Sequence, residues 1–274
     1  GAKLMTQENI QDFMSQFHNQ PFDAWGYTYN QVKESLAPVK LKWFLDELKN
    51  RKGPQSIYES ASGIGLNLYM TLEIIQENTD LSNIYIYSNE YLPKSVQRAN
   101  NLFEYATPPS GKKGIICPGD SMNLSFVPAH SFDIVYTGYI SPDWDPLKLN
   151  KSFRKNYDIM AGWCSDITAN KTTATTEHSK TLARLMQQFQ EKHYYRWVAE
   201  MVRIAKPGSP VIIESISYPY CQNTNDWGGV DKNFWKEKLI DSFGLPVQKD
   251  SVQYMDLSGL DMKRYHVFMR KLKL

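Results

Sequence analysis

Short apolar runs alternate with amphipathic stretches along most of this chain. Apolar residues with helical spacing extend over residues 66–76, 93–106 and 181–205. Between these stretches lie runs with the length and composition of buried strands: "SIYES", "NIYIYSNE", "GIICPGD", "SFDIVYTGYI" and "PVIIESIS". The alternation predicts an α/β fold with a doubly wound, mostly parallel sheet and helices on both faces. Such a sheet binds its ligands at the carboxyl ends of its strands.

The end of the chain departs from this alternation. A helical stretch over residues 233–244 is followed by the strand-like runs "DSVQYMDL" and "KRYHVFMRKLKL", which predict a terminal antiparallel hairpin. Two regions lie outside the alternating core. Residues 1–53 are mostly helical by pattern and are expected to form an N-terminal extension or cap to a Rossmann-like domain over residues 54–274. Residues 141–180 are polar but rich in aromatic side chains, and are expected to form an inserted lid.

Composition narrows the classes of partner. The formal net charge is +2 and no long run of like charges occurs, so no nucleic-acid partner is expected. No apolar run approaches the roughly 18 to 20 residues of a membrane span, so no membrane association is expected either. Cys117, Cys164 and Cys221 are odd in number and far apart, which argues against a disulfide framework or a zinc cluster. A reducing, intracellular and cytoplasmic location is the simplest interpretation.

The first strand-to-helix turn carries the first candidate chemistry. In "SIYESASGIGLNL", Glu59, Ala61, Gly63 and Gly65 have the spacing E-x-A-x-G-x-G. Small residues let the backbone approach a ligand closely, and the following helix offers free N–H groups to an anionic group. Ala61 stands where a glycine would be expected. We interpret it as a tolerated departure, because such a turn does not require positive φ at every small position.

The next strand ends provide a second set of polar groups. Glu90 ends the second strand, where a carboxylate can accept two hydrogen bonds from a ribose. Asp120 and Ser121 follow the third strand in "CPGDSMNLSF" and are placed to reach the edge of an adenine ring. With these residues the sequence resembles the class I, Rossmann-like S-adenosylmethionine-dependent methyltransferases. The resemblance covers residues 56–140 and resumes at "WVAEMVRIAKPGSPVIIES", residues 197–215.

The resemblance implies a seven-stranded sheet with an antiparallel C-terminal strand, and S-adenosyl-L-methionine as the cofactor, with S-adenosyl-L-homocysteine as its product. It also implies that the first turn surrounds the methionine part of the cofactor, that Glu90 holds the ribose and that Tyr91 lies against the adenine. The implied cofactor-binding residues are Glu59, Ala61, Ser62, Gly63, Gly65, Glu90, Tyr91, Asp120, Ser121, Met122, Thr137, Gly138 and Tyr139. A dinucleotide-dependent dehydrogenase is the nearest competitor, but "ASGIGLNL" lacks its G-x-G-x-x-G pattern.

A methyl group on a sulfonium is already electrophilic, so the protein need only align the acceptor with it. A general base is needed only for an acceptor that loses a proton. No histidine is paired with an acid at a convincing spacing in the sequence. The catalytic residue is therefore left open, with His178 and His193 as weak candidates for a base and surface or packing roles more frequent for each. An amine or sulfur acceptor is favoured on this ground. No metal is expected, because "SPDWDP" is more often a turn than a metal site.

The acceptor is expected to contact the regions outside the core. Aromatic faces there suit a cationic group, and arginines could hold a carboxylate. Each aromatic residue could equally belong to a small satellite core beneath the lid. The candidate acceptor-binding residues are Trp25, Tyr27, Tyr29, Trp144, Arg154, Tyr157, Trp163, Arg196 and Trp227.

Three functions remain in competition. The leading hypothesis is an S-adenosylmethionine-dependent methyltransferase with a small-molecule acceptor as its partner. A nucleic-acid or protein methyltransferase is less favoured, because "TGYISPDW" lacks the Asp/Asn-Pro-Pro-aromatic turn of many enzymes that methylate amino groups of nucleic acids. A non-catalytic protein that binds S-adenosylmethionine would keep the same contacts. The sequence leaves the acceptor, and the choice between monomer and homodimer, open.

Overall fold

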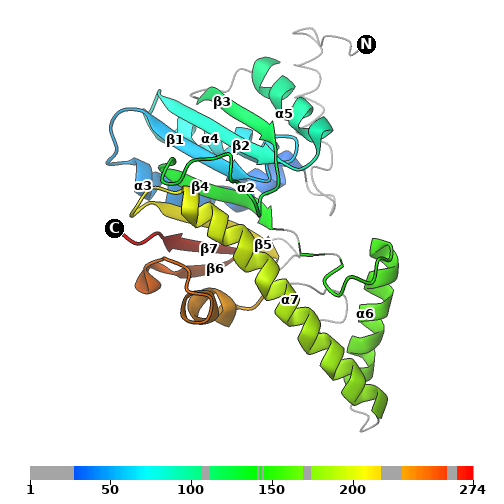
Figure 1. Ribbon diagram of the computed structural model, residues 1–274. Helices are drawn as coiled ribbons and strands as arrows, with labels where there is room; N and C mark the ends of the chain where they lie inside the picture. Colours follow the sequence, from blue (N-terminus) through cyan, green and yellow to red (C-terminus); the bar gives the residue numbers. More distant parts are fainter. Residues whose placement is uncertain are drawn as a thin grey trace, which may run out of the picture.

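The computed structural model of the protein describes residues 28–105, 111–140, 142–143, 145–168, 174–216, 230–257 and 264–273. Its centre is a seven-stranded sheet (Figure 1). The strands are β1 (Gln55–Ser60), β2 (Ile84–Glu90), β3 (Gly111–Pro118), β4 (Ile134–Ile140), β5 (Pro210–Ile216), β6 (Gln253–Leu257) and β7 (Arg264–Arg270).

The strand order is β3-β2-β1-β4-β5-β7-β6. Neighbouring strands from β3 to β5 are parallel, whereas β7 lies antiparallel between β5 and β6. The predicted doubly wound sheet and its terminal antiparallel hairpin are both confirmed. Because β1 and β4 are neighbours while the chain moves outward from β1 to β3 before it returns, the order reverses between them. A ligand crevice of this architecture lies at that reversal, at the carboxyl ends of the strands.

Helices cover both faces of the sheet, and α7 passes in front of it in Figure 1. One face packs against α2 (Tyr29–Lys40), η1 (Leu41–Leu45), α3 (Asp46–Leu48), α4 (Leu66–Asn78) and α5 (Pro93–Tyr105). The other face packs against α7 (Ala174–Ile204), η2 (Phe234–Lys238) and α8 (Leu239–Asp241). A short 3-10 turn, η3 (Lys249–Ser251), precedes β6.

The predicted insertion contains a helix, α6 (Phe153–Thr168), and the first turns of α7. The long helix begins at Ala174 rather than near residue 181, so α6 and α7 form a helical hairpin that reaches beyond the arrowhead ends of the strands (Figure 1). At about 1.5 Å per residue, the 31 residues of α7 extend well past the sheet. Met160 and Met186 hold the two helices together.

One cysteine prediction is wrong. Cys164 on α6 is disulfide-bonded, whereas Cys117 on β3 is free. Spacing along the chain failed here because a disulfide depends on proximity in the fold, which distant cysteines acquire only after folding. The argument for a reducing compartment loses its support with it. Among the described helices, none combines the length and apolar character needed to span a membrane.

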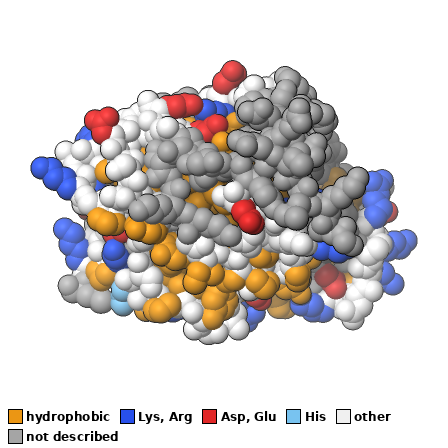
Figure 2. All heavy atoms as spheres, turned by 90° about the horizontal axis from the view of Figure 1, so that it is seen from above, with side chains coloured by type: hydrophobic (Ala, Val, Ile, Leu, Met, Phe, Trp, Pro, Cys, Tyr) orange, Lys and Arg blue, Asp and Glu red, His pale blue; other side chains and the backbone are white. Residues whose placement is uncertain are grey.

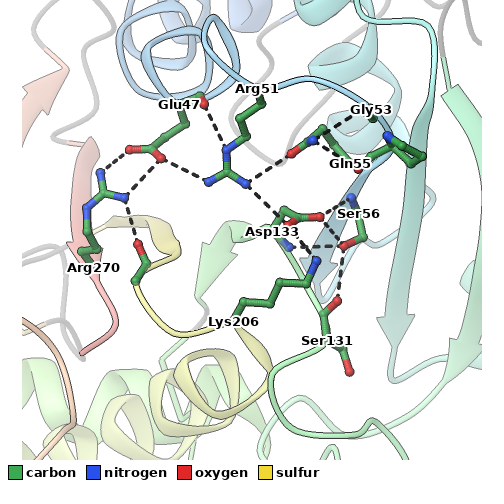
Figure 3. A network of polar contacts seen from close by, with 11 residues as sticks. Glu47, Arg51, Gly53, Gln55, Ser56, Ser131, Asp133, Lys206 and Arg270 are labelled. Carbon is green, nitrogen blue, oxygen red and sulfur yellow. Dashed lines mark hydrogen bonds and ion pairs between the residues drawn. The ribbon is translucent and has the colours of Figure 1, made fainter. Parts of the chain in front are cut away.

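A polar network joins the opposite, amino-terminal ends of the strands (Figure 3). Glu47 on α3 accepts hydrogen bonds from Arg51, at 3.3 Å, and from Arg270 at the end of β7. Arg51 lies 3.5 Å from Asp133, which also accepts a hydrogen bond from Lys206 at 2.7 Å. These residues tie α3 to the starts of β4 and β5 and to the end of β7. The network therefore has a structural role, away from the ligand-binding edge.

The face of β2 and β3 opposite α4 and α5 includes an apolar surface. Figure 2 shows the molecule from above, with hydrophobic side chains gathered in the lower half of the view. Ile115 and Phe126 are exposed, and a cavity of about 310 Å³ lies between them and the rings of Tyr58, Tyr87 and Phe132. Tyr58, Tyr87 and Ile115 lie on the strands, whereas Phe126 and Phe132 belong to the segment between β3 and β4, so this cavity lies between a face of the sheet and that segment.

Candidate functional site

The turn after β1 has a backbone that favours glycine. Gly63 and Gly65 have φ values of 56° and 86°, and Ala61 has a φ of 55°. The expectation that Ala61 avoids positive φ is therefore wrong. An L-residue in this conformation costs roughly 1 to 2 kcal/mol, because its Cβ crowds the following carbonyl oxygen. A strained non-glycine residue in a candidate binding turn is consistent with a backbone held for function rather than for stability.

Glu90 connects this turn to the end of β2. One carboxylate oxygen accepts a hydrogen bond from the backbone N–H of Gly63 at 3.0 Å, and the other accepts one from Leu92 at 3.1 Å. A carboxylate can accept about four hydrogen bonds, so both oxygens keep capacity for a ribose hydroxyl. Glu90 is predicted to bind the ribose, and in the structure it also fixes the shape of the turn.

Asn89 is a site residue that sequence reasoning missed. Its buried amide nitrogen donates to Ser121 Oγ at 2.9 Å and to the Gly119 carbonyl at 3.1 Å, and its oxygen accepts from Tyr58 at 2.8 Å. It therefore holds the segment after β3 against the end of β2. A polar amide in the buried run "NIYIYSNE" was the available signal.

The predicted adenine-side residues meet at the carboxyl ends of β2 and β3. Tyr91 is 73% exposed, which leaves its ring available for stacking. Asp120 is exposed, and its carboxylate accepts a hydrogen bond from the backbone N–H of Met122 at 2.9 Å, while Ser121 is buried. This arrangement can hold a flat, polar-edged ring, because it combines an open aromatic face with neighbouring polar groups.

A buried polar cluster lies between β1, β4 and α4. Glu59 is 1% exposed and accepts a hydrogen bond from Asn67 of α4 at 2.6 Å. The hydroxyl of Tyr136 on β4 also lies at Glu59, and burial together with this carboxylate raises the pKa of Tyr136 well above its usual range. Gly138 packs so closely that a Cβ there would lie 2.3 Å from Asn67 Nδ2. The sequence indicated Glu59 and Gly138 but neither Asn67 nor Tyr136.

One buried hydroxyl in the turn lacks a partner. Ser62 Oγ has no hydrogen-bond partner among the described residues, although its side chain is buried. Native structures seldom leave a buried polar group unpaired, so this atom is consistent with a ligand that donates to it or accepts from it. The small residues at positions 63 and 65 give such a ligand access to the backbone.

The weak base candidates lie in different surroundings. His193 packs edge-on against Trp197, with ring centroids 6.0 Å apart, and Trp197 donates a hydrogen bond to Ser60 Oγ at the end of β1. His193 therefore lies toward the sheet. His178 is exposed in the first turns of α7. The described residues contain no group of three or more histidine, cysteine or acidic side chains that could hold a metal ion.

The acceptor candidates separate into three groups. Tyr29 is buried in the core and donates to Glu73 on α4. Tyr157 and Trp163 are partly buried against Met160 and Met186 between α6 and α7, which is the satellite-core alternative. The remaining described candidates, Arg154 and Arg196, are exposed. Arg154 forms an ion pair with Asp158 at 3.4 Å. Trp25, Tyr27, Trp144 and Trp227, and the side chain of Tyr139, lie outside what the structure describes.

Similar solved structures share the fold at low sequence identity. A Listeria monocytogenes protein assigned to the class I S-adenosylmethionine-dependent methyltransferases is 10% identical, with a TM-score of 0.55, over 98% of this chain and 69% of that one. The CurJ carbon methyltransferase is 8% identical, with a TM-score of 0.53, over 97% of this chain and 60% of its own. The DszA carbon methyltransferase is 12% identical, with a TM-score of 0.50, over 90% of this chain and 54% of its own.

This chain thus spans little more than half the length of the two carbon methyltransferases. No protein-family model matches the sequence, and no curated protein matches it. The structural likeness establishes a Rossmann-like methyltransferase fold.

Proposed function

We propose that this protein is an S-adenosylmethionine-dependent methyltransferase that acts on a small-molecule acceptor. The observation that carries the proposal is the turn at residues 61–65, which combines positive φ values with the unpaired buried hydroxyl of Ser62. It lies at the carboxyl edge of a sheet with the methyltransferase fold. The residues present fit the cofactor, since carboxylate, backbone and aromatic groups meet there.

In this proposal, Glu90 binds the ribose hydroxyls and the turn binds the methionine part. Tyr91 stacks on the adenine, and the segment 120–122 reads its edge. When bound, the cofactor supplies an electrophilic methyl group on a positively charged sulfur. The contribution of the chain is to hold an acceptor atom in line with that methyl, which lowers the barrier by orientation. Gly138 and the cluster around Glu59 shape the surface on which the two meet.

A small acceptor is supported by the modest net charge of +2, which offers no long electrostatic surface for nucleic acid. A methyltransferase of nucleic acids or proteins is the alternative. A protein that binds the cofactor without turnover is the other alternative.

Calorimetry with S-adenosylhomocysteine tests the cofactor site. We expect Glu90→Ala to weaken binding by about 1 to 3 kcal/mol, because charge-assisted hydrogen bonds are lost and the Gly63 N–H loses its acceptor. Glu104→Ala on α5 is the matched control, since this glutamate is exposed. The proposal would be refuted if folded wild-type protein released no heat with S-adenosylmethionine or with S-adenosylhomocysteine. Unchanged affinity in Glu90→Ala would place the ribose elsewhere.

A second experiment separates an enzyme from a binding protein. Release of S-adenosylhomocysteine is measured with panels of amine, thioether and phenol acceptors. We expect turnover with at least one panel of small molecules. Cofactor binding without turnover in any panel, or turnover with RNA, DNA or protein alone, would favour an alternative function.

A further inference from the structure

The connection between β3 and β4 differs from the other connections of the parallel part of the sheet. Residues 119–133, which form it, are all described and contain no helix, whereas the connections from β1 to β2, from β2 to β3 and from β4 to β5 each contain at least one. The crossover between two parallel strands normally supplies a helix that covers the sheet. Because α7 packs against β4 (Figure 1), the same face of β2 and β3 is left, within the described chain, to this helix-free segment.

The cavity of about 310 Å³ lies between this segment and the strands. The rings of Tyr58 on β1 and Tyr87 on β2 lie 4.8 and 5.2 Å from the ring of Phe132, between centroids. At the cavity, Ile115 on β3 is 67% exposed and Phe126 of the segment is 52% exposed. Large apolar side chains thus line two facing walls and remain open to solvent. A recess with two walls suits an inserted small molecule better than the convex surface of a second protein.

The lining of the cavity specifies a neutral aromatic ligand. Among its described lining residues none carries a charged side chain, so a charged ligand would lose its hydration without gaining a counterion. Tyr58, Tyr87 and Phe132 offer ring faces and edges against which a further ring can pack. The volume is close to the lower end of the range for ligand pockets, about 300 to 1,000 Å³, which suits a molecule of one or two fused rings.

The cavity walls also contact the segment that is expected to bind the adenine. Tyr58 donates a hydrogen bond to the side chain of Asn89 at 2.8 Å. Asn89 in turn donates to Ser121 Oγ at 2.9 Å and to the Gly119 carbonyl at 3.1 Å. On the other wall, the ring of Phe126 lies so close to Gly119 that a Cβ there would be 2.7 Å from it. The described lining residues nevertheless include none of the candidate cofactor-binding residues.

We propose that this cavity is a second ligand site, for a neutral aromatic molecule of one or two rings, and that its occupant tightens binding of the cofactor. A ligand packed against Tyr58 and Phe126 restricts the segment from Gly119 to Ser121. A segment that is already restricted loses less freedom when the cofactor binds, which makes the coupling positive. The site itself goes beyond the proposed function, and only the coupling rests on that function.

A footprint on Cys117 tests the site. This free cysteine of β3 lines the cavity. Burial raises the pKa of its thiol, so labelling with iodoacetamide is carried out at alkaline pH, where enough thiolate is present to react. The labelling rate of the peptide that contains Cys117 is followed by mass spectrometry, with indole as the neutral two-ring probe. We expect saturating indole to slow labelling about fivefold or more, because it covers the thiol.

Indole-3-acetate is the matched control ligand, because it adds a negative charge to the same ring system. Its affinity, measured by calorimetry, is expected to be about tenfold or more below that of indole, because its carboxylate finds no counterion in the cavity. Cys117→Phe fills the cavity with a ring and is expected to abolish the heat of indole binding. Cys117→Ser is the matched control variant, since it leaves the cavity open and is expected to bind indole as the wild type does. Melting curves establish that each variant is folded.

The coupling is measured with both ligands. Saturating indole is expected to tighten S-adenosylhomocysteine binding about fivefold, and by linkage S-adenosylhomocysteine tightens indole binding by the same factor. Indole alone is expected to slow hydrogen exchange at the amides of residues 119–122. Tyr58→Phe retains the ring but loses the hydrogen bond to Asn89, so it is expected to bind indole while the coupling is reduced.

The outcomes separate this inference from the proposed function. If the wild type releases no heat with either cofactor form, the proposed function fails and the coupling fails with it, whereas slower labelling of Cys117 with indole still supports the site. Unchanged labelling with indole, or equal affinity for indole-3-acetate, overturns the site. Labelling that slows with rising protein concentration in the absence of indole would show that a second copy covers the cavity, which also overturns it. Unchanged S-adenosylhomocysteine affinity in saturating indole overturns the coupling. Should Cys117→Phe not fold, the footprint on the wild type and the comparison with indole-3-acetate decide the question.

Discussion

Gly138 gives the sharpest test of how the candidate site is packed. Its φ is not among the positive values, so an alanine there would suffer no backbone strain and the effect would be steric. The new Cβ would lie 2.3 Å from Asn67 Nδ2, 2.8 Å from Asn67 Cγ and 3.2 Å from a carboxylate oxygen of Glu59. Real Cβ atoms do not approach other atoms this closely, so Asn67 must move away.

The cost of Gly138→Ala has two parts. Overpacking a buried site costs about 1 to 3 kcal/mol. Moving Asn67 also breaks its 2.6 Å hydrogen bond to Glu59, which leaves a buried carboxylate with one donor fewer, at about 1 to 3 kcal/mol. Because relaxation of α4 serves both parts, we expect a loss of about 2 to 4 kcal/mol in the free energy of unfolding. Cofactor affinity is expected to fall as well, since Asn67 lies in the first turn of the helix that follows the binding turn.

Urea denaturation and calorimetry with S-adenosylhomocysteine measure the two effects. Gly162→Ala on α6 is the matched control, because nothing lies within 4 Å of a Cβ at that position. A helical glycine replaced by alanine is expected to gain about 0.5 to 1 kcal/mol. Equal stability of Gly138→Ala and the wild type, with unchanged cofactor affinity, would refute the packing described for Gly138, Asn67 and Glu59.

Three further variants test separate parts of the structure. Ala61→Gly relieves about 1 to 2 kcal/mol of positive-φ strain but adds about 0.5 to 1 kcal/mol of unfolded-state entropy; urea denaturation is expected to show a net gain of up to about 1 kcal/mol, and a loss would contradict the strain. Trp163→Ala is expected to reduce turnover or acceptor affinity while cofactor affinity stays nearly intact; equal losses in both, with a lower melting temperature, would identify Trp163 as a core residue only. Burial alone would raise the pKa of Asp133, but hydrogen bonds from Lys206 and Ser56 outweigh it and hold that pKa below its usual range. This stabilisation is present above the unfolded pKa of about 4 and is lost as the pH falls further. Asp133→Asn is expected to cost about 1 kcal/mol at neutral pH, allowing for partial exposure, and to flatten the acid side of the stability curve measured in urea; an unchanged acid side would contradict the assignment.

The pattern of apolar and polar residues within each segment was enough to predict the sheet and most of the polar residues at the carboxyl ends of its strands. A strand and the helix after it are recognised from the spacing of apolar residues within one segment, so β1 to β5 and the terminal hairpin followed from the sequence. Glu90, Asp120 and the small residues of the first turn were indicated for the same reason, because each sits where a strand ends. Their side chains need only that local position to reach a ligand at the carboxyl edge.

The tertiary structure decided the contacts between segments far apart in the chain. Asn67 and Gly138 meet because α4 packs over β4. The spacing of residues within either segment does not predict that contact. Glu214 and His266 face each other through the register of β5 with β7, where a shift of one residue would turn His266 to the other face. The positive φ of Ala61 and the disulfide of Cys164 were likewise set by surroundings rather than by residue type. Periodicity records what each residue does within its own helix or strand, whereas these pairings depend on the three-dimensional arrangement that buries them.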